Sequence, residues 1–413
     1  MTPEEAERYI LSRELFGMRF GLDRMWRLMT ALGHPQRQFQ SIHVVGTNGK
    51  SSTTRMIGAI LHAHRLRTGT YLSPHLVSFG ERIRIDDADL EPAAFAEAVT
   101  RAARAAELVD RSLAEGDRVT QFELLTAAAY SELATRNVEV AVIEAGLGGR
   151  FDATNVIPSR VQVLTSVGLE HTRWLGPTIT DIAKEKLAIV QEDATLVLGA
   201  GLDPEAELVA ESIAPERHLR MIRAGAEPGV AVGAPGAFQR RNFALARTAA
   251  EAYLGELDAE AVAEAAASVR VPGRLQVIAD HPLVVLDGAH NPQGAAALIE
   301  SLPEVIGSRR PLVAAISILD DKDAAGMLGT LLPQCDALVC TTSQNPRALP
   351  PPTLLSLSSQ LNGPPGEIVP EPRLAIERAR DLAGEKGAVL ATGSIYLIAD
   401  LLRPESSVRA SML

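Results

Sequence analysis

Along the chain, short apolar runs alternate with longer amphipathic stretches, which is typical of α/β proteins with mostly parallel sheets. The apolar runs predict strands at residues 41–45, 138–143, 161–167, 195–198, 283–286, 312–318, 337–341 and 389–392. The amphipathic stretches predict helices over residues 3–15, 22–32, 50–65, 92–115, 121–135, 179–189, 237–254 and 258–269. Between residues 204 and 236 the spacing of hydrophobic residues becomes irregular, and we expect smaller strands and loops there.

A break in the helical pattern at Val271-Pro272-Gly273-Arg274 marks the predicted domain boundary. A length of 413 residues is enough for two or three domains with their own cores. The pattern predicts two, with the first over residues 1–269 and a second β/α series over residues 270–413. The final residues, 405–413, are expected to form a loose tail.

Charge and composition exclude several classes of protein. A net charge of -11, from 40 basic and 51 acidic residues, argues against binding to nucleic acid or to an anionic membrane by bulk charge. A local basic site could still bind a polyanion. The acidic start predicts no signal peptide, and no apolar run approaches the roughly 18 residues of a membrane span. We therefore expect a soluble, cytoplasmic protein, in which Cys335 and Cys340 act as small buried hydrophobic residues.

The segment Gly46-Thr47-Asn48-Gly49-Lys50-Ser51 lies between a predicted strand and a predicted helix, where a phosphate-binding loop is found. Glycines let the backbone N–H groups turn toward phosphate oxygens, and Lys50 adds a positive charge. The match to the full phosphate-loop pattern is incomplete, because Val44 stands where that pattern has glycine. On these residues alone, a plain glycine turn and a GTPase-like or kinase-like NTPase remain alternatives.

Three further segments are ambiguous when each is taken alone. Glu144 follows a predicted strand and could hold Mg²⁺ beside a nucleotide, or it could be a solvated loop residue. His171, after the next strand, could be a metal ligand or a loop histidine. Ser73, in Ser73-Pro74-His75-Leu76, could simply belong to a turn.

Taken together and in order, these segments resemble the folylpolyglutamate synthase/dihydrofolate synthase family, a branch of the Mur ligases. The resemblance covers nearly the whole chain. Its remaining segments are Phe16-Gly17, Gly21-Leu22-Asp23-Arg24, His43-Val44-Val45, Thr120-Gln121-Phe122-Glu123, Gly148-Gly149-Arg150, Leu175-Gly176-Pro177-Thr178, Glu185-Lys186, Pro272-Gly273-Arg274, Asp287-Gly288-Ala289-His290-Asn291-Pro292 and Ala391-Thr392-Gly393-Ser394-Ile395-Tyr396-Leu397.

The resemblance implies a fold and an activity. The fold is a Mur-ligase-like ATPase domain with a phosphate loop and a mostly parallel sheet, followed by a smaller Rossmann-like α/β domain that is the glutamate ligase domain. The activity is ATP-dependent addition of L-glutamate to dihydropteroate, to reduced folates, or to both, through an acyl phosphate, releasing ADP and phosphate. The implied cofactor is Mg²⁺, and a monomer without nucleic-acid or membrane partners is expected.

The resemblance also assigns roles to individual residues. Lys50, Lys186 and His290 are the catalytic candidates, and Lys186 matches the lysine that the family carries as a carbamate. ATP contacts are assigned to Thr47, Asn48, Gly49, Lys50, Ser51, Asn242, Arg274 and Asp287. The metal ligands are Ser73, Glu144 and His171, with Ser51 as an additional candidate. The dihydropteroate-type ligand is assigned to Thr120, Gln121, Phe122, Glu123, Phe151, Asp152 and Ala153.

The chain departs from the common family pattern in three places. Ser51-Ser52 follows Lys50 where many relatives have glycine, Glu170 replaces an aspartate before His171, and Leu187-Ala188-Ile189 replaces alanine-glycine after Lys186. None removes a catalytic group, although the last change alters the surroundings of the predicted carbamate. Two alternatives are a Mur-type ligase for another acidic acceptor and a nucleotide-binding regulatory protein that no longer ligates.

Overall fold

The computed structural model describes residues 1–13 and 21–404, and it divides into two compact units. Of the described residues, unit 1 contains those within Met1–Gly233 and Arg241–Val269, whereas unit 2 contains Ala234–Arg240 and residues 270–404. The motif Phe16-Gly17 and the predicted tail 405–413 lie outside the described residues. No helix in the described part of the chain is both long enough and apolar enough to cross a membrane.

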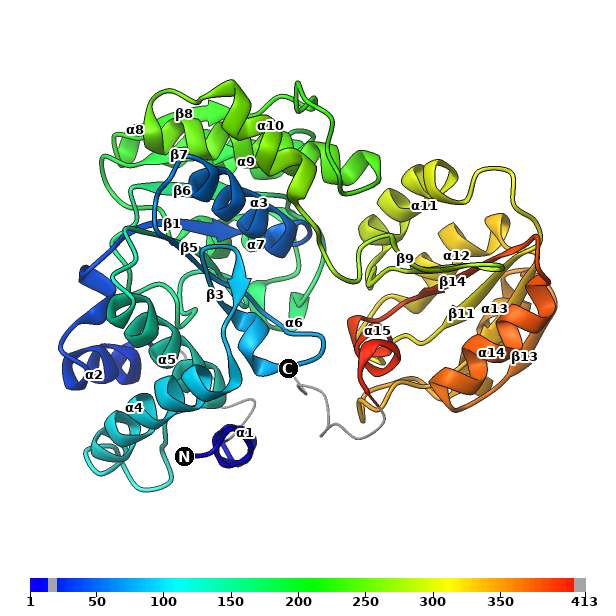
Figure 1. The fold of residues 1–413 in the computed structure, drawn as a ribbon, viewed down its shortest axis with the longest axis horizontal. Coiled ribbons are helices and arrows are strands. Elements are labelled where there is room, and N and C mark those ends of the chain that lie inside the picture. The colour runs from blue at the N-terminus through cyan, green and yellow to red at the C-terminus, as the bar shows by residue number, and fades with distance from the viewer. Residues whose placement is uncertain (14–20, 405–413) are drawn as a thin grey trace. The chain divides into compact units, whose positions relative to one another are not determined.

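Unit 1 is built on an eight-stranded sheet in the order β4-β3-β2-β5-β1-β6-β7-β8 (Figure 1). The strands are β1 (Gln40–Val45), β2 (Thr68–Tyr71), β3 (Ile83–Ile85), β4 (Ala88–Asp89), β5 (Val140–Glu144), β6 (Val161–Leu164), β7 (Thr195–Leu198) and β8 (Arg220–Arg223). From β2 to β8 all neighbours are parallel, and β3 and β4 add an antiparallel edge. The central strands β1, β5 and β6 are almost wholly buried, as expected for a parallel sheet covered on both faces.

Helices surround this sheet and form apolar cores with it. They are α1 (Pro3–Leu11), α2 (Asp23–Ala31), α3 (Lys50–Ala63), α4 (Pro92–Asp110), α5 (Gln121–Thr135), α6 (Thr172–Leu175), α7 (Ile179–Leu187), α8 (Pro204–Glu216), α9 (Ala237–Leu254) and α10 (Ala259–Ser268), with short 3₁₀ turns at η1 (Pro35–Arg37) and η2 (Phe79–Arg82). One core joins α1, α2, α4 and α5 to β2 and β5. A second lies between α7, α8 and the strands β6 and β7.

Unit 2 has a six-stranded sheet in the order β13-β12-β11-β14-β10-β9, in which β9 alone is antiparallel to its neighbour. Its strands are β9 (Gln276–Asp280), β10 (Leu283–Leu286), β11 (Leu312–Ile316), β12 (Ala337–Cys340), β13 (Gly366–Ile368) and β14 (Ala388–Thr392). Its helices are α11 (Pro292–Ile306), α12 (Ala324–Leu331), α13 (Pro351–Gln360), α14 (Pro372–Ala383) and α15 (Ile395–Leu402), with a 3₁₀ turn at η3 (Leu332–Gln334). Cys335 and Cys340 are buried free thiols in this unit, which confirms the prediction for them.

The prediction was wrong at the start of the 204–236 segment. Residues Pro204–Glu216 form α8, a helix of 13 residues. The Asp203 side chain accepts a hydrogen bond from the Glu205 amide and caps the helix, and Pro204 occupies its first turn. The buried residues Ala206, Val209 and Ala210 have helical spacing, but this face is narrow and small, so its period is faint in the sequence.

Candidate functional site

The phosphate loop, residues 46–51, connects β1 to α3 at the carboxyl end of the central strand. Gly49 precedes the helix with φ of 84°, a left-handed conformation that favours glycine. The loop is attached to the segment after β6, because the amide of Thr47 donates to the Ser166 carbonyl and the amide of Asn48 donates to Ser166 Oγ. The first N–H groups of α3 have no acceptor within the helix, so this end of the helix suits an anion.

Two lysine side chains donate to one carbonyl of this loop. Lys50 Nζ donates to the Gly46 and Thr47 carbonyls at 3.0 and 3.1 Å. Lys186 Nζ, from α7, donates to the same Gly46 carbonyl at 2.9 Å. Burial, and secondarily the charge of Lys50, lowers the pKa of Lys186 to about 7. The structure therefore brings both predicted catalytic lysines to the phosphate loop and favours a neutral amine on Lys186.

Glu144 ends β5, the strand beside β1, and is only 1% exposed. Its Oε1 accepts from the Ser51 hydroxyl at 2.8 Å, and its Oε2 accepts from the Ser73 amide at 3.0 Å. Three of the predicted metal-site residues are thus together. Carboxylate and hydroxyl oxygens beside a phosphate loop are the donors that Mg²⁺ prefers, so these residues fit such an ion.

His171 follows β6 and caps α6 with φ of 52°. Its Nε2 lies 3.9 Å from Glu170 Oε1. Within the described ranges, no group of three or more histidine, cysteine or acidic side chains could hold a metal ion. Any ion bound by Ser51, Ser73 and Glu144 would therefore depend on hydroxyl oxygens, and the role of His171 stays a prediction.

The second glycine-rich segment, residues 146–155, is here called the Asp152 loop. The Asp152 carboxylate accepts hydrogen bonds from the Leu147 amide at 2.8 Å and the Thr154 amide at 3.0 Å. Burial raises the pKa of Asp152, and these hydrogen bonds oppose the shift. Phe151 is 44% exposed while Ala153 is buried, so Phe151 is the member of the predicted triplet that projects from the loop.

The Asp152 loop also contacts α7. A Cβ atom on Gly149 would lie 2.6 Å from the carbonyl oxygens of both Glu185 and Lys186. The Arg150 amide donates to the Glu185 carbonyl at 3.0 Å, and Arg150 Nε pairs with Glu185 Oε1 at 2.8 Å. Since the Lys186 side chain reaches the phosphate loop, α7 contacts both loops.

The predicted ligand segment at the start of α5 is largely engaged within the protein. Thr120 and Glu123 form a reciprocal capping box, and Gln121 is fully buried. Phe122 lies against Gly146, where a Cβ would come within 2.6 Å of its ring. Both Glu123 oxygens accept from Arg24 Nε at 3.0 Å.

Arg24 was missed as a site candidate, although its segment belongs to the motifs of the resemblance. It is 8% exposed and pairs with Asp117 at 3.2 Å as well as with Glu123. Burial lowers the pKa of Arg24, but the bonds to Glu123 and Asp117 outweigh burial and leave it raised. The sequence signal was the Gly21-Leu22-Asp23-Arg24 motif itself, but the partner acids are more than 90 residues away.

Asn242, in α9, lies beside the phosphate loop. A Cβ atom on Gly49 would come within 2.6 Å of Asn242 Oδ1. Unit 1 therefore brings this predicted nucleotide-contacting residue against the loop.

The remaining residues predicted to contact the nucleotide or the reacting groups lie in unit 2, near the end of β10; they are Arg274, Asp287 and His290. Asp287 is 2% exposed and accepts from the Leu275 and Ala289 amides at 2.9 and 2.8 Å. Burial raises the pKa of Asp287 despite the nearby Arg274 guanidinium. His290 Nδ1 is 2.9 Å from the Gly288 carbonyl, and a Cβ on Gly288 would meet Arg274 at 2.3 Å. Arg274, Asp287 and His290 thus form one local cluster.

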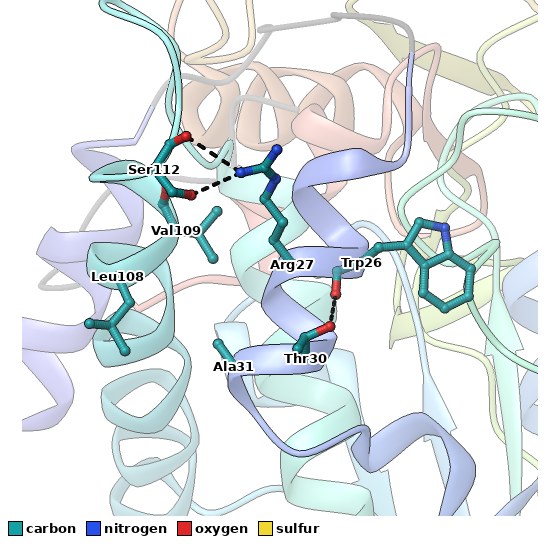
Figure 2. A pocket seen from close by; sticks show the side chains of 7 residues that line it. All are labelled: Trp26, Arg27, Thr30, Ala31, Leu108, Val109 and Ser112. Atoms are coloured by element: carbon teal, nitrogen blue, oxygen red, sulfur yellow. Dashed lines mark hydrogen bonds between the residues drawn. The ribbon is translucent and has the colours of Figure 1, made fainter.

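A separate pocket of about 380 Å³ lies between α2 and α4 (Figure 2). Its lining is Trp26, Arg27, Thr30, Ala31, Leu108, Val109 and Ser112, which includes no predicted site residue. The Arg27 guanidinium bonds to Ser112 Oγ at 3.1 Å and to Asp23 at 2.7 Å. The pocket is therefore distinct from the lysine and glutamate cluster.

Comparison with known proteins first defines the class of protein to which this chain belongs. The Mur ligase middle domain matches residues 44–234, and the Mur ligase glutamate ligase domain matches residues 273–395. Within that class, the chain is 35% identical over 409 residues to the Mycobacterium tuberculosis dihydrofolate synthase/folylpolyglutamate synthase, covering 88% of this chain and 84% of that protein. The chain belongs to the dihydrofolate synthase/folylpolyglutamate synthase family.

Solved structures of similar proteins have the same fold. The M. tuberculosis folylpolyglutamate synthase complexed with ADP and AMPPCP superimposes with a TM-score of 0.89 at 33% identity, covering 96% of this chain and 97% of that one. E. coli FolC in complex with DHPP and ADP gives 0.86 at 28% identity, covering 97% of each chain. The Yersinia pestis folylpolyglutamate synthase/dihydrofolate synthase with AMPPNP and Mn ion gives 0.84 at 27%, again covering 97% of each. These similarities confirm the predicted α/β fold of the Mur ligase type.

Proposed function

We propose that this chain is an ATP-dependent ligase that adds L-glutamate to dihydropteroate, to reduced folates, or to both. The observation that carries the proposal is the cluster at the phosphate loop: Lys50, Lys186 and Glu144 lie around it, in a chain of this family. The complex of the M. tuberculosis relative with ADP and AMPPCP and the complex of E. coli FolC with DHPP and ADP support the choice of substrates.

The chemistry begins with a carboxylate of the acceptor, which attacks the γ-phosphorus of ATP and releases ADP. The resulting acyl phosphate has a good leaving group, so the amino group of glutamate attacks its carbonyl carbon. Phosphate leaves with the C–O electron pair, the nitrogen loses a proton, and an amide remains. The acceptor carboxylate, the transferred phosphoryl group and the nucleotide are all negatively charged. The main tasks of the protein are therefore to position these groups and to compensate their charge.

Individual residues of the site can be assigned to positioning and to charge compensation. Lys50 and the first N–H groups of α3 bind the triphosphate. Glu144, Ser51, Ser73 and, by resemblance, His171 would hold Mg²⁺, which when bound supplies positive charge beside the transferred phosphoryl group. The similarity to an Mn-containing relative supports a divalent ion, and its identity as Mg²⁺ is part of this proposal.

Lys186 is proposed to carry a carbamate. A neutral amine adds CO₂ and releases a proton, so the lowered pKa of about 7 makes Lys186 competent for this reaction at neutral pH. Asn242, Arg274, Asp287 and His290 are proposed to contact the nucleotide or the reacting groups. Phe122, Phe151, Asp152 and the start of α5 are proposed to form the acceptor site. A monomeric state and a cytoplasmic location also stay predictions.

The test is an assay of glutamate-dependent ADP release, with dihydropteroate and with tetrahydrofolate as separate acceptors. We expect turnover on at least one acceptor and none when glutamate or the acceptor is omitted. Well-folded protein that binds ATP but releases no ADP with either acceptor would contradict the proposal. Turnover on a different acidic acceptor would then indicate another Mur-type ligase.

A further inference from the structure

The Asp152 loop is organised by an anion that faces inward. Besides the hydrogen bonds from the two backbone amides, the Asp152 carboxylate accepts a hydrogen bond from the Thr154 hydroxyl through Oδ1. The Asp152 amide in turn donates to the Gly149 carbonyl at 3.1 Å, and the Asn155 amide donates to the Asp152 carbonyl at 2.9 Å. Asp152 is only 6% exposed, so its charge is stabilised mainly by these hydrogen bonds.

Thr154 connects this carboxylate to the strand that leads into the phosphate loop. Its Oγ1 lies 2.8 Å from His43 Nε2. Because the single hydroxyl proton goes to Asp152, the hydroxyl oxygen must accept from His43, and the proton of the ring lies on Nε2. The Thr154 carbonyl also accepts from the Tyr130 hydroxyl, in α5, at 2.9 Å.

His43 is suited to donate one hydrogen bond and to carry no charge. It is fully buried in β1, three residues before Gly46, and its burial lowers the pKa of the ring to about 3. At neutral pH the ring is therefore uncharged, with one N–H donor. A proton-transfer role would need a pKa near the working pH, so a role in positioning fits the group better.

We propose that His43 and Thr154 are positioning residues for the acceptor site. His43, fixed in β1, orients the Thr154 hydroxyl, which holds Asp152 and with it the exposed Phe151 at a set position relative to the phosphate loop. This proposal rests on the function proposed above. It matters because the acceptor carboxylate must be aligned with the γ-phosphate, and small displacements of bound reactants greatly reduce the rate of transfer.

The test compares Thr154→Val, which keeps the shape but removes the hydroxyl, with Thr154→Ser, which restores the hydroxyl. We expect Thr154→Val to raise the KM for the acceptor about tenfold, the size expected for loss of one partner of a buried charge, with the KM for ATP within about twofold of wild type. Thr154→Ser should return the acceptor KM to within about threefold of wild type. His43→Leu removes only the bond between His43 and the Thr154 hydroxyl and leaves the bond from Thr154 to Asp152. It should raise the acceptor KM in the same direction as Thr154→Val, but by a smaller factor.

A second readout does not depend on activity. Hydrogen exchange followed by mass spectrometry should show faster exchange over residues 146–155 in Thr154→Val, with unchanged exchange over residues 50–63. An unchanged acceptor KM, or equal rises in the KM values for acceptor and ATP, would overturn the positioning role. Inactive wild-type protein that shows the expected exchange difference would instead contradict the proposed function and leave the loop-holding bond supported.

Discussion

The phosphate loop and the Asp152 loop both follow buried parallel strands, β1 and β5, that lie side by side in the sheet. Each loop is held by hydrogen bonds to side chains, but the side chains differ: lysines bind the phosphate loop and an aspartate binds the Asp152 loop. The carbonyls of Gly46 and Thr47 accept from the side-chain nitrogens of Lys50 and Lys186, whereas amides of the Asp152 loop donate to the Asp152 carboxylate.

This difference determines what each loop offers to a ligand. A loop whose carbonyls bind internal cations keeps positive charge beside its helix N-terminus, which suits a polyphosphate. A loop whose amides point at an internal carboxylate has fewer donors for an anion and instead presents Phe151. We therefore expect the two glycine-rich segments to serve different ligands.

The largest effect is expected when the phosphate loop loses its cation. Lys50→Ala should lower glutamate-dependent ADP release by roughly 100-fold or more, because a positioned charge at the reacting phosphate is removed. Lys184→Ala, which changes an exposed lysine of α7, is the matched control and should retain near-wild-type rates. A wild-type rate in Lys50→Ala would contradict the role given to this loop.

An intermediate effect is expected where the Asp152 loop meets α7. Gly149→Ala should lower the free energy of unfolding by about 2 kcal/mol, since the added Cβ meets two backbone carbonyls at 2.6 Å. Gly225→Ala is the control, because a Cβ there meets nothing within 4 Å. Chemical denaturation should separate the two variants. Equal stability of both would show that the contact with α7 is dispensable.

The smallest effect, when counted per pH unit, concerns Lys186, the residue whose helix contacts both loops. Its pKa is lowered from about 10.4 in an unfolded chain to about 7 in the fold, so the unfolded state binds more protons between these values. Stability should therefore rise with pH from about 7 to 10, with a slope of up to ~1.4 kcal/mol per pH unit. In Lys186→Met, the free energy of unfolding should not show this rise with pH when unfolding is measured in CO₂-depleted buffer.

Mass spectrometry under mild conditions, with and without bicarbonate, checks the carbamate on the same residue. A mass increase of one CO₂ in wild type that is absent from Lys186→Met is the expected result. The same pH slope in both proteins would show that Lys186 titrates normally, and the proposed route to the carbamate would fail.

Local patterns in the sequence predicted most elements of the two sheets because buried parallel strands are nearly continuous apolar runs. They predicted no strand at the short or exposed β3, β4, β9 and β13, and no helix at α8, where the apolar signal is slight. They also missed β2, which is buried but has the sequence Thr-Gly-Thr-Tyr rather than an apolar run. The phosphate loop was identifiable because its chemistry lies within six consecutive residues, and the remaining site residues came from motifs of the family.

Only the tertiary structure decided which of these residues meet. Lys186 and Gly46 are 140 positions apart, Arg24 and Glu123 are 99 apart, and His43 and Thr154 are 111 apart. Parallel strand order and helix packing bring such residues together, and neither follows from local periodicity. The sequence by itself determined the α/β elements, the phosphate loop and the family. The fold determined that one loop is held by lysine side chains and the other by a buried carboxylate, because polar and charged groups act through space rather than along the chain.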